Sequence, residues 1–172
     1  MNETTRPDNE QLTEAFGSLA LALLGDTPIR HVWRLSVLLN LYAGPLYKEI
    51  FERISLDRLG FVVLFTLDRH NGLAARDIVQ ATSFPKNSIS RAISRLKKRK
   101  FIIDQVDPND KRSKKLGITP SGKQIVGMIV PMLEDRQNSM RSVLDDKERE
   151  TFDRCLEKII YAMPQWIRAG IS

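Results

Sequence analysis

The chain has 172 residues, the size of one ordinary domain, and 42% of them are hydrophobic, which is enough to bury a core and argues against wholesale disorder. Lys and Arg number 27 against 21 Asp and Glu, so the net charge is +6. This basic excess favours a polyanionic partner, either nucleic acid or an anionic membrane surface, over an acidic substrate.

Cysteine and apolar content give no reason to expect a cross-link or a membrane span. The single Cys155 cannot form an internal disulfide, and no Cys/His cluster has zinc-ligand spacing, so we expect no metal or other cofactor. Residues 1–10 lack the features of an export signal, and the apolar stretch 32–46 is short and interrupted by polar residues. These features predict a cytoplasmic protein.

Two helical patterns begin the chain. Residues 1–28 form an N-terminal extension in which leucine and phenylalanine recur with the spacing of an amphipathic helix. Residues 29–54 carry apolar side chains over much of the helical circumference, which is typical of a helix packed on more than one side. Because proline removes a donor and clashes with the preceding turn, we expect this second helix to kink or break at Gly44-Pro45.

An apolar run and two shorter helices follow. An apolar run at 59–67 ends in a turn that contains Asn71-Gly72, and a short helix is expected over 73–82. Pro85 then introduces a helix that runs to Lys98, because proline is well tolerated in a first turn.

The remaining chain predicts a β-hairpin and two further helices. Residues 101–106 and 114–118 are strand-like and are joined by a charged tip of turn-forming residues. Thr119-Pro120 has the pattern of an N-cap with proline in the first helical position. Asp145 is placed to cap the last helix, which we expect to end at Pro164. The predicted fold class is mainly α with a small β-hairpin.

The basic charge is concentrated in residues 86–115. This segment holds eleven Lys and Arg against three Asp, a net charge of +8, whereas the rest of the chain carries −2. A uniformly solvated surface would not collect its basic excess in one helix and hairpin. We therefore expect the segment to bind a polyanion.

The helix over 86–98 separates its residues into two faces. The apolar face consists of Ile89, Ala92, Ile93 and Leu96. The opposite face and its flanks carry Asn87, Ser88, Ser90, Arg91, Ser94, Arg95 and Lys98. Small hydroxyls allow close approach, arginine bonds guanine or phosphate, and asparagine pairs with adenine, which suits a helix in the major groove. A membrane-binding helix would place bulky apolar residues beside its lysines, so we favour nucleic acid over a membrane.

The order of these elements resembles a known family. The helix pair 73–98, the tip Asp107-Pro108-Asn109-Asp110-Lys111-Arg112 and the following Thr119-Pro120-Ser121-Gly122 are similar to the winged helix-turn-helix of MarR-type transcriptional regulators. The resemblance is close over about residues 55–125 and looser in the flanking helices. Its most specific part is the acidic turn with its arginine and the Thr-Pro-x-Gly stretch.

The resemblance implies a division of the chain. A winged helix-turn-helix at 55–120 is expected between dimerisation helices at 29–54 and 121–172, with residues 1–28 as an extension. Proteins of this family are two-fold dimers, and two-fold symmetry implies a palindromic operator with half-sites about one helical turn apart. The expected partners are double-stranded DNA and a second copy of the chain.

The resemblance also implies DNA contacts. In this family the second helix of the motif enters the major groove, and a wing arginine held by an acid reaches the minor groove; Arg112 and Asp110 match that pair. The candidate contacts in the recognition helix are Lys86, Asn87, Ser88, Ser90, Arg91, Ser94, Arg95 and Lys98. The candidate contacts in the wing are Asp110, Lys111, Arg112, Lys114 and Lys115.

An effector pocket is a further implication, because the family commonly binds small aromatic acids where its dimerisation and DNA-binding parts join. The candidate lining residues are His31, Trp33, Tyr42, Tyr47 and Phe51, although their spacing alone is also that of a core. Together these inferences predict a homodimeric repressor that is released by a small aromatic effector.

Other residues suggest alternatives. The two histidines, His31 and His70, and Cys155 have no catalytic spacing, so we do not expect an enzyme. Winged helices also bind proteins, which makes a protein-interaction module the alternative function. Cys155 would serve a redox-sensing regulator, but its apolar neighbours favour a buried structural thiol.

Overall fold

The computed structural model describes residues 14, 17, 30–38, 40, 43–106 and 114–169. These residues divide into two compact units, of which the first extends to Pro131 and the second begins at Met132. The helix expected in residues 1–28 lies outside the described residues, apart from residues 14 and 17.

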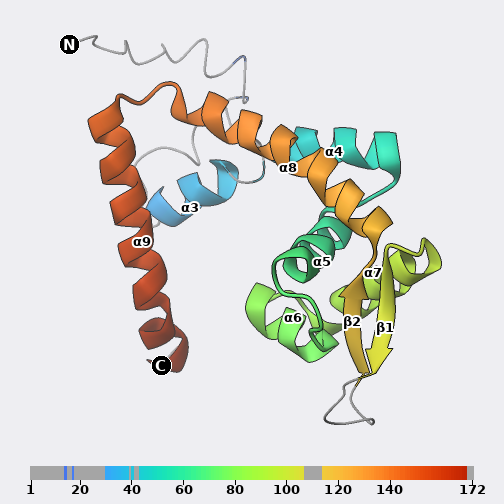
Figure 1. The fold of residues 1–172 in the computed structure, drawn as a ribbon. Helices are drawn as coiled ribbons and strands as arrows, with labels where there is room; N and C mark the ends of the chain where they lie inside the picture. Colours follow the sequence, from blue (N-terminus) through green and yellow to red (C-terminus); the bar gives the residue numbers. More distant parts are fainter. Residues whose placement is uncertain are drawn as a thin grey trace. The chain divides into compact units, whose positions relative to one another are not determined.

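The described elements are mostly helices, with one antiparallel hairpin, as the sequence predicts (Figure 1). In chain order they are α3 (Arg30–Val37), α4 (Ala43–Ile54), α5 (Arg58–Arg69), α6 (Ala75–Thr82), α7 (Lys86–Lys98), β1 (Ile102–Val106), β2 (Lys114–Ile118), α8 (Pro120–Arg141) and α9 (Asp146–Ala169). The first part of α8 belongs to the first unit and its remainder to the second.

The described residues of the region 29–54 include two α-helices. α3 ends at Val37 and α4 begins at Ala43, so Gly44 and Pro45 lie in the first turn of α4. The expected kink or break places this dipeptide inside a helix, whereas the structure has it in a first turn; residues 39, 41 and 42 lie outside the described residues. The first N–H groups of a helix have no intrahelical acceptor, so proline costs no hydrogen bond at this position.

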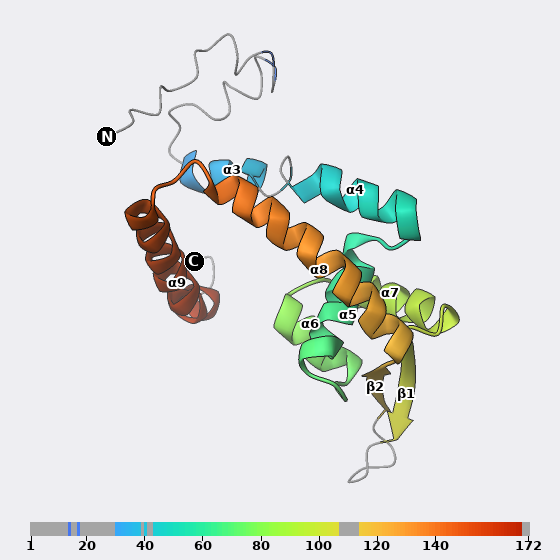
Figure 2. The same ribbon diagram turned by 45° about the horizontal axis from the view of Figure 1, so that its top comes forward.

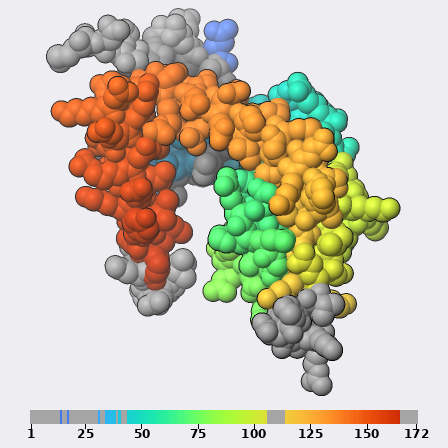
Figure 3. Space-filling view, in the orientation of Figure 1, coloured from blue at the N-terminus to red at the C-terminus, as the bar shows by residue number. Residues whose placement is uncertain are grey.

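The core of the first unit lies between α5, α6 and α7. Figures 1 and 2 show these helices grouped beside the hairpin. In the space-filling view, side chains of α5 and α6 lie next to those of the hairpin and of the start of α8 (Figure 3). The buried apolar residues of the three helices are Phe61, Val63, Leu64, Leu67, Ile78, Ile89, Ala92, Ile93 and Leu96. Burial of this set holds α7 in a fixed orientation.

The turn between α6 and α7 is short and closely defined. α6 begins after Ala74, whose backbone N–H donates to the Asp77 carboxylate at 2.8 Å. Asp77, in the first turn of the helix, therefore satisfies an N–H group that has no intrahelical acceptor. Ser83 then adopts a left-handed conformation with φ 56°, and Pro85 precedes the first residue of α7. The helix expected up to Lys98 is confirmed at both ends.

The hairpin is attached to the helices through the α5–α6 connection. β1 and β2 pair with Ile102 opposite Ile118 and with Val106 opposite Lys114. On its other side β2 pairs with Leu73: the Leu116 N–H donates to the Leu73 carbonyl at 2.8 Å. The backbone N–H of Ile118 donates to the Asn71 side chain at 3.0 Å. The hairpin therefore has a fixed base.

The end of α7 and the start of α8 meet at a crowded junction. The Thr119 hydroxyl accepts a hydrogen bond from the Gly122 N–H at 3.1 Å, and it lies 2.8 Å from the Lys100 carbonyl, to which it donates. The Thr119 N–H donates to the Phe101 carbonyl at 3.0 Å. A Cβ atom on Gly122 would lie 2.3 Å from that carbonyl oxygen. The Thr-Pro-x-Gly stretch therefore has two roles: Thr119 caps α8, and Gly122 allows the helix to pack closely against the Phe101 backbone.

The second unit contains the end of α8 and α9. The Glu148 N–H donates to the Asp145 carboxylate at 2.8 Å, and the Asp145 N–H donates to the Glu148 carboxylate at 2.9 Å. This reciprocal pair is a capping box, and it confirms Asp145 as the cap. The Arg141 guanidinium pairs with Asp153 at 2.6 Å.

Two expectations for α9 are wrong. The helix runs through Pro164 to Ala169, because proline deprives only the Ile160 carbonyl of its donor, and Ile160 is exposed. Cys155 is also exposed in the chain and not buried, because its face of α9 is uncovered. Among the helices described, none has the length and apolar content needed to cross a membrane.

Candidate nucleic-acid interface

The outer face of α7 is polar, basic and exposed. Asn87, Ser90, Arg91, Ser94 and Lys98 are exposed, and Ser88 is half-buried. All four apolar residues assigned to the inner face are buried, which confirms the predicted division of the helix. Ser90, Arg91, Ser94 and Arg95 line a shallow, open hollow on the outer side. The Ser94 hydroxyl donates to the Ser90 carbonyl at 3.0 Å, so this side chain lies close to the helix.

Three cations at the end of α7 are held by other parts of the first unit. Arg95 donates through Nη2 to the Asp57 carboxylate at 2.5 Å, and Lys97 donates to Asp104 at 2.5 Å. Arg99 donates to the Ser55 carbonyl at 2.9 Å, and its guanidinium lies 4.5 Å from the centre of the Phe101 ring. These contacts orient the three cations, and the two carboxylates partly compensate the charges of Arg95 and Lys97.

The remaining cations of this helix and its end are available to a ligand. Lys86, Arg91, Lys98 and Lys100 are exposed, and none of them makes an ion pair or hydrogen bond with a side chain in the described part of the chain. Arg91 lies in the middle of the outer face, one turn before Arg95. A long, charged side chain in this position can reach a groove without losing an internal partner.

The wing is described only at its base. Lys114 is exposed at the start of β2, and Lys115 is half-buried beside it. Asp110, Lys111 and Arg112 lie outside the described residues, and so does the expected pairing of Asp110 with Arg112.

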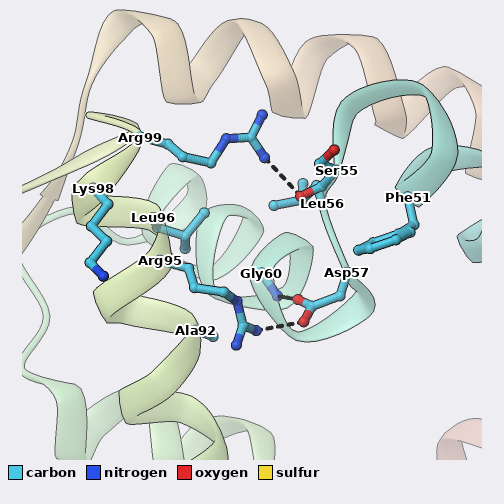
Figure 4. Close-up of a pocket in the computed structure, with 10 residues that line it drawn as sticks. All are labelled: Phe51, Ser55, Leu56, Asp57, Gly60, Ala92, Arg95, Leu96, Lys98 and Arg99. Atoms are coloured by element: carbon cyan, nitrogen blue, oxygen red, sulfur yellow. Dashed lines mark hydrogen bonds and ion pairs between the residues drawn. The ribbon is translucent and has the colours of Figure 1, made fainter.

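A cavity of about 250 Å³ lies beside α7 (Figure 4). Its residues come from the end of α4, the α4–α5 corner, the start of α5 and the flank of α7. The lining residues are Phe51, Ser55, Leu56, Asp57, Gly60, Ala92, Arg95, Leu96, Lys98 and Arg99. Apolar side chains and the aliphatic parts of arginines therefore form its walls, and Arg95, Lys98 and Arg99 place cationic groups beside it.

The structure describes the side chains of three of the five candidate effector-pocket residues, His31, Tyr47 and Phe51. Of these three, only Phe51 lines this cavity. Tyr47 instead packs against Phe61, with ring centres 6.4 Å apart, and Arg58 lies over its ring. Burial raises the pKa of the Tyr47 hydroxyl above its usual 10.0, and the nearby Arg58 charge partly offsets the shift. His31 is exposed on α3, whereas the Trp33 side chain and Tyr42 lie outside the described residues.

Sequence reasoning missed Asp57, whose carboxylate caps α5 by accepting the Gly60 N–H at 2.8 Å and also binds Arg95. An Asp before an apolar run is a signal for the cap. No local pattern indicates the second contact, because Arg95 is 38 residues further along the chain. Within the described chain, no group of three or more His, Cys, Asp or Glu is placed to hold a metal ion.

Comparisons with known proteins find a family match in the middle of the chain. The family model for the MarR family matches residues 55–113. The Bacillus subtilis protein YwaE, described as an uncharacterized HTH-type transcriptional regulator, is 23% identical over 131 residues, which are 73% of this chain and 77% of YwaE.

Solved structures agree with the family match. Bordetella bronchiseptica BpsR, whose DNA binding is regulated by 6-hydroxynicotinic acid, is 26% identical, with a TM-score of 0.66 over 78% of this chain and 96% of its own. The MepR protein of S. aureus, solved in complex with DNA, is 22% identical, with a TM-score of 0.63 over 74% of this chain and 95% of its own. Residues 55–113 of this chain therefore match the MarR family, and the chain has the fold of MarR-type winged-helix regulators.

Proposed function

We propose that the chain is a sequence-specific regulator that represses transcription by occupying a promoter. The observation that carries this proposal is the outer face of α7, where exposed Arg91 and Lys98 lie among small hydroxyl side chains. Such a face fits the major groove of DNA, where arginine reads guanine. The protein acts in the cytoplasm, by binding and not by catalysis.

The proposed contacts divide into base reading and phosphate binding. Arg91 reads a guanine edge and Asn87 an adenine edge, while the serines of α7 allow the backbone to approach. Arg112, steadied by Asp110, enters the minor groove. Lysines that flank these groups contact phosphates and set the register on the duplex. These are Lys86, Lys98, Lys111, Lys114 and Lys115.

The proposed assembly is a two-fold homodimer. α9 presents an apolar stripe in which Leu156, Ile159, Ile160 and Met163 are all exposed in the single chain. A stripe of this kind on a soluble domain is usually covered by a partner. A second copy, joined through helices from both ends of the chain, then binds a palindromic operator with half-sites about one helical turn apart.

The proposed effector is a small aromatic acid, because the DNA binding of the related BpsR is regulated by 6-hydroxynicotinic acid. The cavity beside α7 supports this proposal: Phe51 and Leu56 offer apolar contact, and Lys98 offers a positive charge. Occupation of a site next to α7 is expected to weaken operator binding.

Footprinting on genomic fragments tests the proposed function. We expect protection of a symmetric site that overlaps a promoter, and binding that weakens steeply as salt rises, because each phosphate contact releases counterions. Absence of any protected fragment would refute the proposal. Binding to mixed-sequence duplex that does not respond to salt would instead favour a protein-interaction module.

A further inference from the structure

We propose that Asp57 is a specificity-determining residue that keeps Arg95 off DNA, so that Arg91 is the arginine of α7 that reads the operator. The inference rests on the proposed function, because it concerns how α7 meets DNA. It changes the role of Arg95 from a contact to a positioning residue.

The Asp57 carboxylate is a rigid acceptor. Its Oδ1 accepts the Gly60 N–H at 2.8 Å, and its Oδ2 accepts Arg95 Nη2 at 2.5 Å (Figure 4). Because Oδ1 is held by the first turn of α5, the second oxygen points in one direction, toward α7. The guanidinium of Arg95 is therefore drawn to the α4–α5 corner and away from the middle of the outer face.

A second contact, made by the residue that follows α7, fixes the same corner. Arg99 donates to the Ser55 carbonyl at 2.9 Å and lies over the Phe101 ring. The helices behind these contacts are joined by a buried core that includes Leu64 and Leu96. The corner that carries Asp57 is thus held beside α7 by packing as well as by the ion pair.

The electrostatic consequence differs between the two arginines of α7. A phosphate near Arg95 also meets the compensating charge of Asp57, whereas Arg91 has no acidic partner in the described chain. Binding to mixed-sequence DNA grows with the number of uncompensated cations. Specificity is the difference between the affinity for the operator and the affinity for mixed-sequence DNA. An ion pair that keeps Arg95 from binding phosphate lowers the second affinity and so raises the preference for the operator.

The test is a double-mutant cycle on the full-length chain. Asp57→Asn removes the charge but retains the cap, because asparagine caps helices as well as aspartate does. We expect Asp57→Asn to bind a mixed-sequence duplex about eightfold more tightly at about 0.1 M salt and with a salt slope larger by about one, the values for one added phosphate contact. Its operator-to-mixed ratio should fall.

Arg95→Gln completes the cycle. In the wild-type background it should change affinity for either duplex less than about twofold, whereas in the Asp57→Asn background it should abolish the gain in affinity and in salt slope. A loss of folding alone would lower affinity without this dependence on background. Thermal unfolding of each variant verifies that α5 remains capped.

Asp104→Asn is the matched control, because it removes the same charge from an ion pair of the same length with Lys97, on the other flank of α7. We expect a smaller gain in affinity for the mixed-sequence duplex than for Asp57→Asn. An equal gain would attribute the effect to overall charge and overturn the proposal. So would a tenfold loss on Arg95→Gln in the wild-type background. If the wild-type chain binds no duplex, the proposed function itself fails before the cycle begins.

Discussion

Alanine in place of Gly122 tests how closely the start of α8 packs against the end of α7. The added Cβ atom would lie 2.3 Å from the Phe101 carbonyl oxygen and 2.8 Å from Cγ1 of Ile118. The carbonyl oxygen belongs to the backbone and already accepts the Thr119 N–H at 3.0 Å. It cannot move away without breaking the junction that joins α7, β1 and α8.

The expected magnitude follows from two opposing effects. Overpacking against a fixed neighbour costs about 3 kcal/mol, at the upper end of the usual range. Alanine is favoured over glycine in a helix by about 1 kcal/mol, which leaves a net loss of about 2 kcal/mol for Gly122→Ala. A Cβ atom on Gly127, in the same helix, would meet no other atom within 4 Å, so Gly127→Ala should instead gain up to about 1 kcal/mol.

Urea denaturation of the two variants measures this difference. With a slope of about 2 kcal/mol per molar, Gly122→Ala should lower the midpoint by about 1 M, and Gly127→Ala should raise it by less than that. The opposite signs are the decisive feature, since both changes add the same methyl group to one helix. A Gly122→Ala chain that is as stable as the wild type would refute the close contact at the junction.

Four further predictions concern binding, assembly and pH. Arg91→Ala should weaken operator binding by about 1 to 3 kcal/mol at fixed salt, and unchanged affinity would remove Arg91 from the interface. Truncation after Lys147 should abolish the dimer in sedimentation experiments, and a dimer that persists would assign assembly to the amino-terminal helices. Arg112→Ala should relax the preference for A·T-rich minor-groove positions, whereas Lys114→Ala should weaken binding to all sequences and lower the salt slope by about one. Burial raises the pKa of Tyr47 in the folded chain, so this group should not affect folding stability below pH 10.0, and its contribution should decline as pH rises above that value. Tyr47→Phe should remove that part of the decline when urea denaturation is measured at alkaline pH.

The parts of the fold that were predicted correctly have local signals. α7 lies where its apolar spacing and Pro85 indicate, β1 and β2 lie within a residue of the expected strands, and Thr119 caps α8. Each of these signals acts within a few residues, through side-chain periodicity, turn preference or capping. The outer face of α7 could be assigned for the same reason, since its position follows from the face that the core buries.

The parts that were predicted wrongly depend on context that local signals do not contain. Pro164 interrupts the hydrogen-bond ladder of α9, yet the exposed helix continues past it. Gly44-Pro45 has the same breaking tendency, and it lies in the first turn of α4, where proline costs no hydrogen bond. Proline lacks a backbone N–H. Its position relative to the start of a helix decides whether that N–H would have had a hydrogen-bond acceptor.

Charge shows the same distinction between composition and tertiary structure. Residues 86–115 carry a net charge of +8, and all of their cations count equally in that total. In the folded chain Arg95 is paired with Asp57, which lies outside the segment, whereas Arg91 is unpaired within the described residues. The two side chains are one turn apart and chemically identical. Their difference arises from a carboxylate that also caps α5, so the cap of one helix and the charge on the outer face of another depend on the same residue.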